Sequence, residues 1–205
     1  MLHLLAAGVV VGLAYWLVRR GRDWRERLAL WVFVFASASL FALSGTYHLL
    51  EVGGAGRAVL QRLDHAAIWV MIAGSFTALH GVAFRGPWRW AFLAVVWAIA
   101  ITGLTLKTIF FDSLPQIGGL VLYLVLGWLG VVSGVVLWRR DGWPAVRSLV
   151  WGGIAYSAGA AYDQAVGPSV VPGVVGAHEL FHVAVVLGAA LHWRAVLRLL
   201  PKVPS

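Results

Sequence analysis

Residues 117–138, IGGLVLYLVLGWLGVVSGVVLW, contain no charged side chain. A membrane-spanning helix needs about 20 predominantly apolar residues, so this stretch is long enough to cross a bilayer. It ends at Arg139-Arg140, a pair of cations typical of a membrane boundary. The stretch therefore predicts a transmembrane helix, and similar apolar runs lie on both sides of it.

The apolar runs along the 205 residues predict seven spans. They cover residues 2–18, 28–50, 64–84, 88–106, 117–138, 148–166 and 176–200. The chain is 61% hydrophobic and 12% charged, with a mean hydropathy of +0.85, and a soluble fold could not bury so much apolar surface. The breaks carry Gly, Pro and Arg, and no long linker or internal repeat is visible. We expect an all-α, polytopic membrane protein in which residues 1–205 form a single domain, one bundle of seven transmembrane helices.

The positive charges gather on one side of this bundle. Of the 16 Lys and Arg residues, 13 fall on the face that holds the C-terminus and 3 on the other face. The positive-inside rule then predicts a cytoplasmic C-terminus and an external N-terminus. Because the cations lie in short segments between spans, we expect them to contact lipid headgroups and not nucleic acid. The sequence favours a bacterial inner membrane and leaves the oligomeric state open.

Ionisable residues inside the spans form one cluster. His48 ends the second span, Asp64 begins the third, and His178 and His182 begin the seventh. The alternation of the spans places all four on the same face, which the charge count predicts to be the outer one. Such residues are costly inside a membrane and are functional candidates by default. The chain has no cysteine, so a transition-metal site must use His and carboxylate ligands.

The spacing of the histidines predicts a zinc site. His178 and His182 are four residues apart and share a helix face, about 6 Å apart along the axis. Together with His48 they would supply three nitrogen ligands to Zn²⁺ and leave a fourth position for water. Asp64 is then expected to orient or deprotonate that water, and Ser44 to hydrogen-bond the water, Asp64 or a substrate carbonyl. Alternatively, the histidines are packing residues, and Asp64 pairs with Arg62 or caps its helix.

The remaining histidines are weaker candidates. His65 is one position off the Asp64 face, and His80 and His192 fall toward the opposite membrane face. His3 lies near the terminus and carries no positional information. For Asp163 on the sixth span, we expect structural hydrogen bonding.

The string His178-Glu179-Leu-Phe-His182 also matches H-E-x-x-H, in which the glutamate is the general base of a metalloprotease. Either His48 or Asp64 could then be the third ligand. This alternative leaves Ser44 and Asp64 without an assigned chemical role.

Several motifs resemble those of a known family when taken together. They are Ser44-x-x-x-His48, Arg62-Leu63-Asp64-His65, Ile72-Ala73-Gly74, Arg85-Gly86-Pro87-Trp88, Lys107, the stretch 152–159, and His178-x-x-x-His182 followed by Leu187-Gly188 and His192. The chain resembles the hemolysin III / progestin and adipoQ receptor (PAQR) family, within a broader group that includes alkaline ceramidases. The resemblance implies seven helices, Zn²⁺ on His48, His178 and His182, and a water linked to Asp64 beside Ser44. Departures from the family pattern include Ala78-Leu79 in place of Thr-Pro, Phe181 in place of Trp, and Glu179 at a small apolar position.

These observations give one leading hypothesis and three alternatives. The leading hypothesis is a zinc-dependent membrane hydrolase that cleaves an acyl lipid, at an amide bond, with Asp64 and Ser44 as catalytic residues. The alternatives are a non-enzymatic receptor or sensor with structural zinc, a hemolysin-type pore-forming protein, and an HExxH membrane protease.

Overall fold

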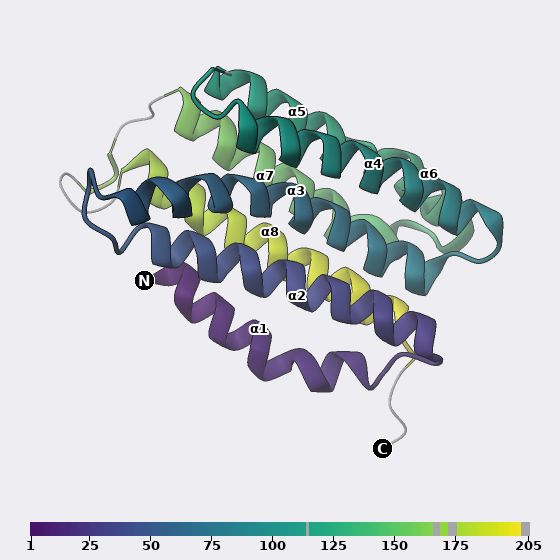
Figure 1. The fold of residues 1–205 in the computed structure, drawn as a ribbon. Helices are drawn as coiled ribbons and strands as arrows, with labels where there is room; N and C mark the ends of the chain where they lie inside the picture. Colours follow the sequence, from purple (N-terminus) through teal and green to yellow (C-terminus); the bar gives the residue numbers. More distant parts are fainter. Residues whose placement is uncertain (114, 166–168, 172–175, 202–205) are drawn as a thin grey trace.

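The structure, a computed structural model of the chain, describes residues 1–113, 115–165, 169–171 and 176–201 (Figure 1). All regular elements in these ranges are α-helices. They are α1 (Leu2–Val18), α2 (Trp24–Tyr47), α3 (Ala55–Ala83), α4 (Pro87–Ile109), α5 (Gln116–Trp128), α6 (Gly130–Asp141), α7 (Trp143–Gln164) and α8 (Ala177–Leu199).

The eight helices form seven helical segments, because α5 and α6 follow one another as a single apolar segment, Ile117–Asp141. By length and composition, this segment and helices α2, α3, α4 and α8 can each cross a membrane. Helix α1 is apolar but shorter, with 17 residues, and α7, with 22 residues, is not apolar enough to be counted with these five. The all-α, polytopic membrane fold expected from the sequence is therefore confirmed.

Most helix boundaries lie within five residues of the predicted spans, and two larger differences are the start of α3 and a break in the fifth span. Helix α3 begins at Ala55, nine residues before the predicted span, so Asp64 lies inside the helix and does not cap it. The polar residues of 55–63 made this segment resemble a loop, although a helix can extend beyond the apolar layer. The fifth span is interrupted at Leu129, where the N–H of Val132 donates to the Leu129 carbonyl at 3.1 Å. Gly127 and Gly130 flank this break, and glycine lowers helix propensity.

The helices run roughly antiparallel, and the two ends of the bundle have different character (Figure 1). The start of α1, the end of α2 and the starts of α3 and α8 lie at one end, which we call the histidine end. The main apolar core joins α1, α2, α3 and α8, with Phe33, Phe41 and Met71 among its buried members. Residues far apart in the chain, from α2 and α8, therefore meet at the histidine end.

At the opposite end, a buried carboxylate ties two loops together. Glu26 is fully buried and accepts bonds from the side chains of Arg22 and Arg85, each at 2.8 Å. Asp23 caps α2 by accepting the N–H of Glu26 at 2.9 Å, and this bond holds the pKa of Asp23 below its usual value. These contacts join the α1–α2 loop to the α3–α4 loop.

Small residues allow neighbouring helices to approach closely. A Cβ placed on Gly74 of α3 would lie 2.6 Å from the Cβ of Ala36 on α2. About two helical turns further along α3, Gly81 faces Ala29 of α2 in the same way. Gly159 of α7 similarly faces Ala184 of α8. Close contact through small residues is how helices commonly associate in membranes. The positions of α2 relative to α3, and of α7 relative to α8, thus depend on these glycines.

A leucine at Gly74 should destabilise the bundle. The larger side chain has no space against Ala36, and overpacking of this kind costs about 1–3 kcal/mol or more. Thermal unfolding of purified Gly74→Leu in detergent should show a clearly lower Tm. Gly12→Leu is the matched control, since Gly12 is exposed on α1 and a Cβ added there would meet nothing within 4 Å. Equal Tm values for the two variants would contradict the close α2–α3 packing.

Candidate metal centre

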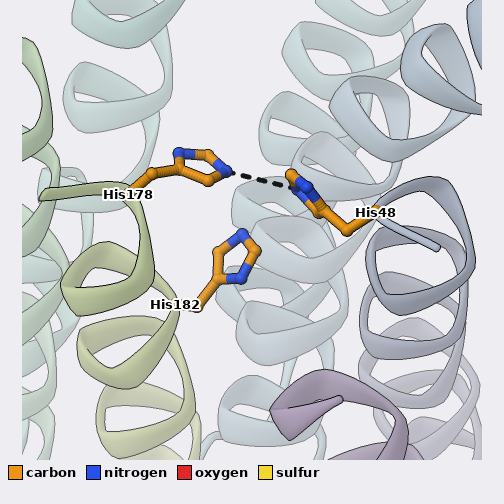
Figure 2. A group of neighbouring side chains, drawn as sticks. All are labelled: His48, His178 and His182. Atoms are coloured by element: carbon orange, nitrogen blue, oxygen red, sulfur yellow. Dashed lines mark hydrogen bonds between the residues drawn. The ribbon is translucent and has the colours of Figure 1, made fainter. Parts of the chain in front are cut away.

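Three histidines converge at the histidine end of the bundle. His48 is the first residue after α2, whereas His178 and His182 lie on the first turns of α8. Figure 2 shows the three rings pointing toward one another, with His48 coming from one side and the α8 pair from the other. The one-turn spacing on α8 places its two rings on the face that looks toward α2. The structure therefore brings together the three residues predicted as ligands.

The distances suit a shared cation. Ligand atoms of His48, His178 and His182 lie within 4.8 Å of one another. The Nε2 atoms of His48 and His178 are 3.2 Å apart, where one ring can donate to the other or both can face a cation. Two nitrogens bound to a tetrahedral Zn²⁺ at ~2.05 Å are roughly 3.3 Å apart. The group could therefore hold a metal ion.

Asp163 on α7 contacts the other nitrogen of one of these rings. Its Oδ1 atom lies 3.3 Å from Nδ1 of His178. A carboxylate that accepts from Nδ1–H fixes the tautomer in which Nε2 carries a lone pair, a frequent arrangement behind metal-binding histidines. The structural hydrogen bonding expected of Asp163 is thus directed at the histidine cluster itself.

Ser44 and Asp64 lie beside the histidines. Ser44 is buried one turn before His48, and its side chain lies close enough to the Asp64 carboxylate to interact with it. The side chain of Asp64 is 14% exposed, and both residues line the same cavity as the three histidines. Arg62, the alternative partner of Asp64, instead forms an ion pair with Asp112 at 2.9 Å. In the structure, Asp64 therefore neither caps α3 nor pairs with Arg62.

His65, His80 and His192 occupy different places. His65 bonds the Gln61 carbonyl through Nδ1 at 2.9 Å, and this atom lies 3.8 Å from Asp64. His80 is fully buried, and its Nε2 lies 2.8 Å from the hydroxyl of Ser133 on α6. His192 packs edge-on against Tyr156. None of these three belongs to the group of converging ligand atoms among the described residues.

His3 is a neighbour of the cluster that the sequence did not reveal. It is buried, with 4% exposure, and its ring stacks on that of His182 with centroids 4.2 Å apart. Its Nε2 atom lies 3.4 Å from the His182 carbonyl, while Nδ1 is buried without a described partner. Nothing in the local pattern around residue 3 indicates this contact, because it depends on how α1 packs across the bundle.

Glu179 is engaged at the start of α8. Its Oε2 atom accepts the backbone N–H of Gly176 at 2.9 Å. Adjacent residues on a helix point in directions about 100° apart, so Glu179 does not share the face of His178 and His182. This capping contact favours a structural role for Glu179 over that of a protease general base.

A long cavity extends from the histidines into the bundle. It has a volume of about 590 Å³ and is lined mainly by apolar side chains of α3, α5, α6, α7 and α8. His178 lines it at the histidine end and Val196 toward the other, a separation along α8 of roughly 27 Å at ~1.5 Å per residue. The cluster of His, Asp and Ser side chains is therefore the polar end of a deep apolar cavity.

Comparison with known proteins shows which families and proteins are similar to this chain in sequence. The family model described as "Haemolysin-III related" matches residues 1–193. The chain is similar to Hemolysin-3 of Bacillus cereus (36% identity, covering 49% of this chain and 45% of that protein) and to the Hemolysin-3 homolog of Bacillus subtilis (30%, covering 71% and 65%). It is also similar to the heptahelical transmembrane protein ADIPOR2 of Oryza sativa (35%, covering 80% and 79%).

The matched parts span less than two thirds of the two Bacillus proteins. The family model, by contrast, covers all of the elements that build the histidine cluster except the end of α8. Its extent is sufficient to assign the family, as the motifs around Ser44, Asp64 and His178 suggested. The chain belongs to the haemolysin-III-related family of membrane proteins.

Proposed function

We propose that this protein is a zinc-dependent integral membrane hydrolase that cleaves an acyl lipid at an amide bond. One observation carries the proposal: three imidazoles with ligand atoms within 4.8 Å of one another lie near Ser44 and Asp64, at one end of a long apolar cavity. Such an arrangement combines a candidate metal site, a candidate base and space for a lipid chain.

Zinc is the metal that suits this set of donors best. The site offers three imidazole nitrogens and no thiolate, and three protein ligands leave one position open for water or substrate, as in catalytic zinc sites. When bound, Zn²⁺ would supply a Lewis acid that polarises a carbonyl and acidifies a water molecule. Asp163 supports the proposal because it holds the His178 ring by its far nitrogen.

Asp64 and Ser44 would perform the proton transfers. Asp64 would accept a proton from the attacking water and deliver it to the leaving amine. Ser44 would donate to Asp64 and keep the carboxylate in the orientation that faces the substrate. Both side chains line the cavity, so a bound amide could reach them.

The cavity supports an acyl lipid as the substrate class. Its apolar walls follow α8 for most of the membrane thickness, which suits an alkyl chain lying parallel to the helices. The choice of an amide bond rests on the resemblance to alkaline ceramidases. We place the site near the outer face of a bacterial inner membrane, with the N-terminus outside and the C-terminus in the cytoplasm, on the charge distribution of the sequence.

Two other functions have a specific observation in their favour. Two relatives are named Hemolysin-3 or its homolog, which suggests a cytolytic activity. His3, stacked on His182, adds a fourth imidazole next to the cluster, and a more closed site would favour structural zinc in a receptor or sensor. Zinc content, fatty acid release and dye leakage together separate these functions from hydrolysis.

Purified protein should contain about one zinc per chain, bound by the three histidines. His178→Ala removes one of three nitrogens and should lower the zinc content to well below half, as measured by elemental analysis after gel filtration. His65→Gln is the matched control, because His65 lies near the site and outside the converging group. Full zinc retention in His178→Ala would contradict the ligand assignment.

Asp64→Asn should abolish hydrolysis while leaving zinc in place. The amide retains the shape of the carboxylate and cannot accept a proton, so release of fatty acid from ceramide-type amide lipids in proteoliposomes should fall by about 10²–10⁴-fold. Zinc content measured on the same sample separates this effect from loss of metal. Wild-type protein that holds zinc and releases no fatty acid would point to the receptor alternative, and dye leakage from the same vesicles would favour the cytolytic one.

A further inference from the structure

A pocket rich in arginine lies at the end of the bundle opposite the histidines. Its volume is about 670 Å³, and the charged side chains that line it are Arg22, Arg85, Arg140, Arg147, Arg198 and Asp141. They come from the α1–α2 loop, the α3–α4 loop, the end of α6, the start of α7 and the end of α8. Figure 1 shows these segments meeting at the end of the bundle away from the N-terminus.

Backbone carbonyls hold two of the guanidinium groups in place. Arg22 donates from Nη2 to the Val82 carbonyl at 2.8 Å, and Arg140 from Nη1 to the Ala83 carbonyl at 2.7 Å. Both carbonyls belong to the last turn of α3, where helix carbonyls lack partners within the helix. A guanidinium has five N–H donors, so these contacts leave further donors available. The pocket is thus lined by cations that are already oriented.

The carboxylates nearby do not balance the arginines. Glu26 pairs with both Arg22 and Arg85, and Asp141 pairs with Arg140. Arg147 and Arg198 have no carboxylate within ion-pair distance in the described part of the chain. Arg198 has instead a weak contact to the Pro144 carbonyl at 3.4 Å, and the charges of Arg194 and Arg147 act on it repulsively. A concave cluster of this kind is stabilised by an anion.

Exposed tryptophans indicate the depth of the pocket in the membrane. Trp138 and Trp143, which flank the α6–α7 connection, are 55% and 48% exposed, and Trp88 at the start of α4 is 47% exposed. Tryptophan is enriched at the level of the lipid headgroups. The positive-inside rule accounts for positive charge on this face of the bundle. It does not account for a concave pocket or for guanidinium groups held by carbonyls at the end of α3.

We propose that this pocket binds the phosphate of an anionic phospholipid headgroup from the adjoining leaflet. Arg147 and Arg198 supply the guanidinium groups that lack a carboxylate partner, and Arg22, Arg85 and Arg140 surround them. Planar guanidinium groups match the oxygens of a phosphate through paired N–H bonds. The acyl chains of the lipid would remain in the bilayer beside the exposed apolar surfaces of α6 and α7. This site is separate from the histidine cluster and does not depend on hydrolysis.

The test is lipid binding to the full-length protein by native mass spectrometry, with phosphatidylglycerol and phosphatidylcholine as probes. Wild-type protein should retain phosphatidylglycerol in preference to phosphatidylcholine. The double variant Arg147→Gln/Arg198→Gln should bind phosphatidylglycerol at least about tenfold more weakly, since each basic residue near an anionic surface contributes measurably to lipid affinity. Inorganic phosphate at millimolar concentration should not displace the lipid.

Arg19→Gln/Arg25→Gln is the matched control. These exposed arginines lie at the same end of the bundle, outside the pocket lining, and their loss changes the net charge equally. The control should bind phosphatidylglycerol as the wild type does, and all variants should share one Tm in neutral detergent. Equal binding by the pocket variant, an equal loss in the control, or displacement by inorganic phosphate would each overturn the proposal. Should the double variant unfold, Arg198→Gln compared with Arg19→Gln provides the same charge-matched test.

Discussion

The meeting of α2 and α8 at one end of the bundle is the constraint on which the site depends. It brings His48 and His178, 130 positions apart in the chain, to a separation of 3.2 Å between ring nitrogens. Imidazoles are weakly basic and would gain little by gathering in an apolar setting on their own. A shared cation gives the convergence a physical reason, and Asp163 and Ser44 are placed where they would support it.

The close approach of the helices makes this meeting possible. Gly74 of α3 allows α2 to pack closely against α3 at Ala36, and Gly159 of α7 allows α8 to pack closely against α7 at Ala184. In a membrane, where lipid chains are as apolar as the helix surfaces, such packing is a main source of association. The same packing leaves space between α3, α5, α7 and α8, where the long cavity lies.

Much of the fold and the predicted cluster followed from periodicity. Seven apolar runs gave seven spans, and the four-residue spacing of His178 and His182 gave a shared helix face. The alternation of spans was enough to place His48, Asp64 and the α8 pair at one end, and the structure brings them together there. Periodicity does not determine which helices pack side by side. His3 was missed for that reason, because its contact with His182 depends on α1 lying across the bundle.

The sequence also did not predict a helix break, the start of one helix and one ion pair. The break at Leu129 occurs inside an apolar run with no charge or proline to mark it, and the early start of α3 lies in a polar stretch that resembled a loop. The ion pair of Arg62 with Asp112 joins two segments 50 positions apart and has no local pattern. This ion pair depends on a tertiary contact between α3 and the segment after α4.

X-ray absorption spectroscopy at the zinc edge of the purified protein tests the central claim most directly. We expect three imidazole nitrogens at about 2.0–2.1 Å and a fourth light-atom ligand that is not an imidazole. A spectrum with two or fewer imidazoles would show that His48 and the α8 pair do not share one ion. Four imidazoles would indicate a closed structural site, and either result would contradict the proposed hydrolase.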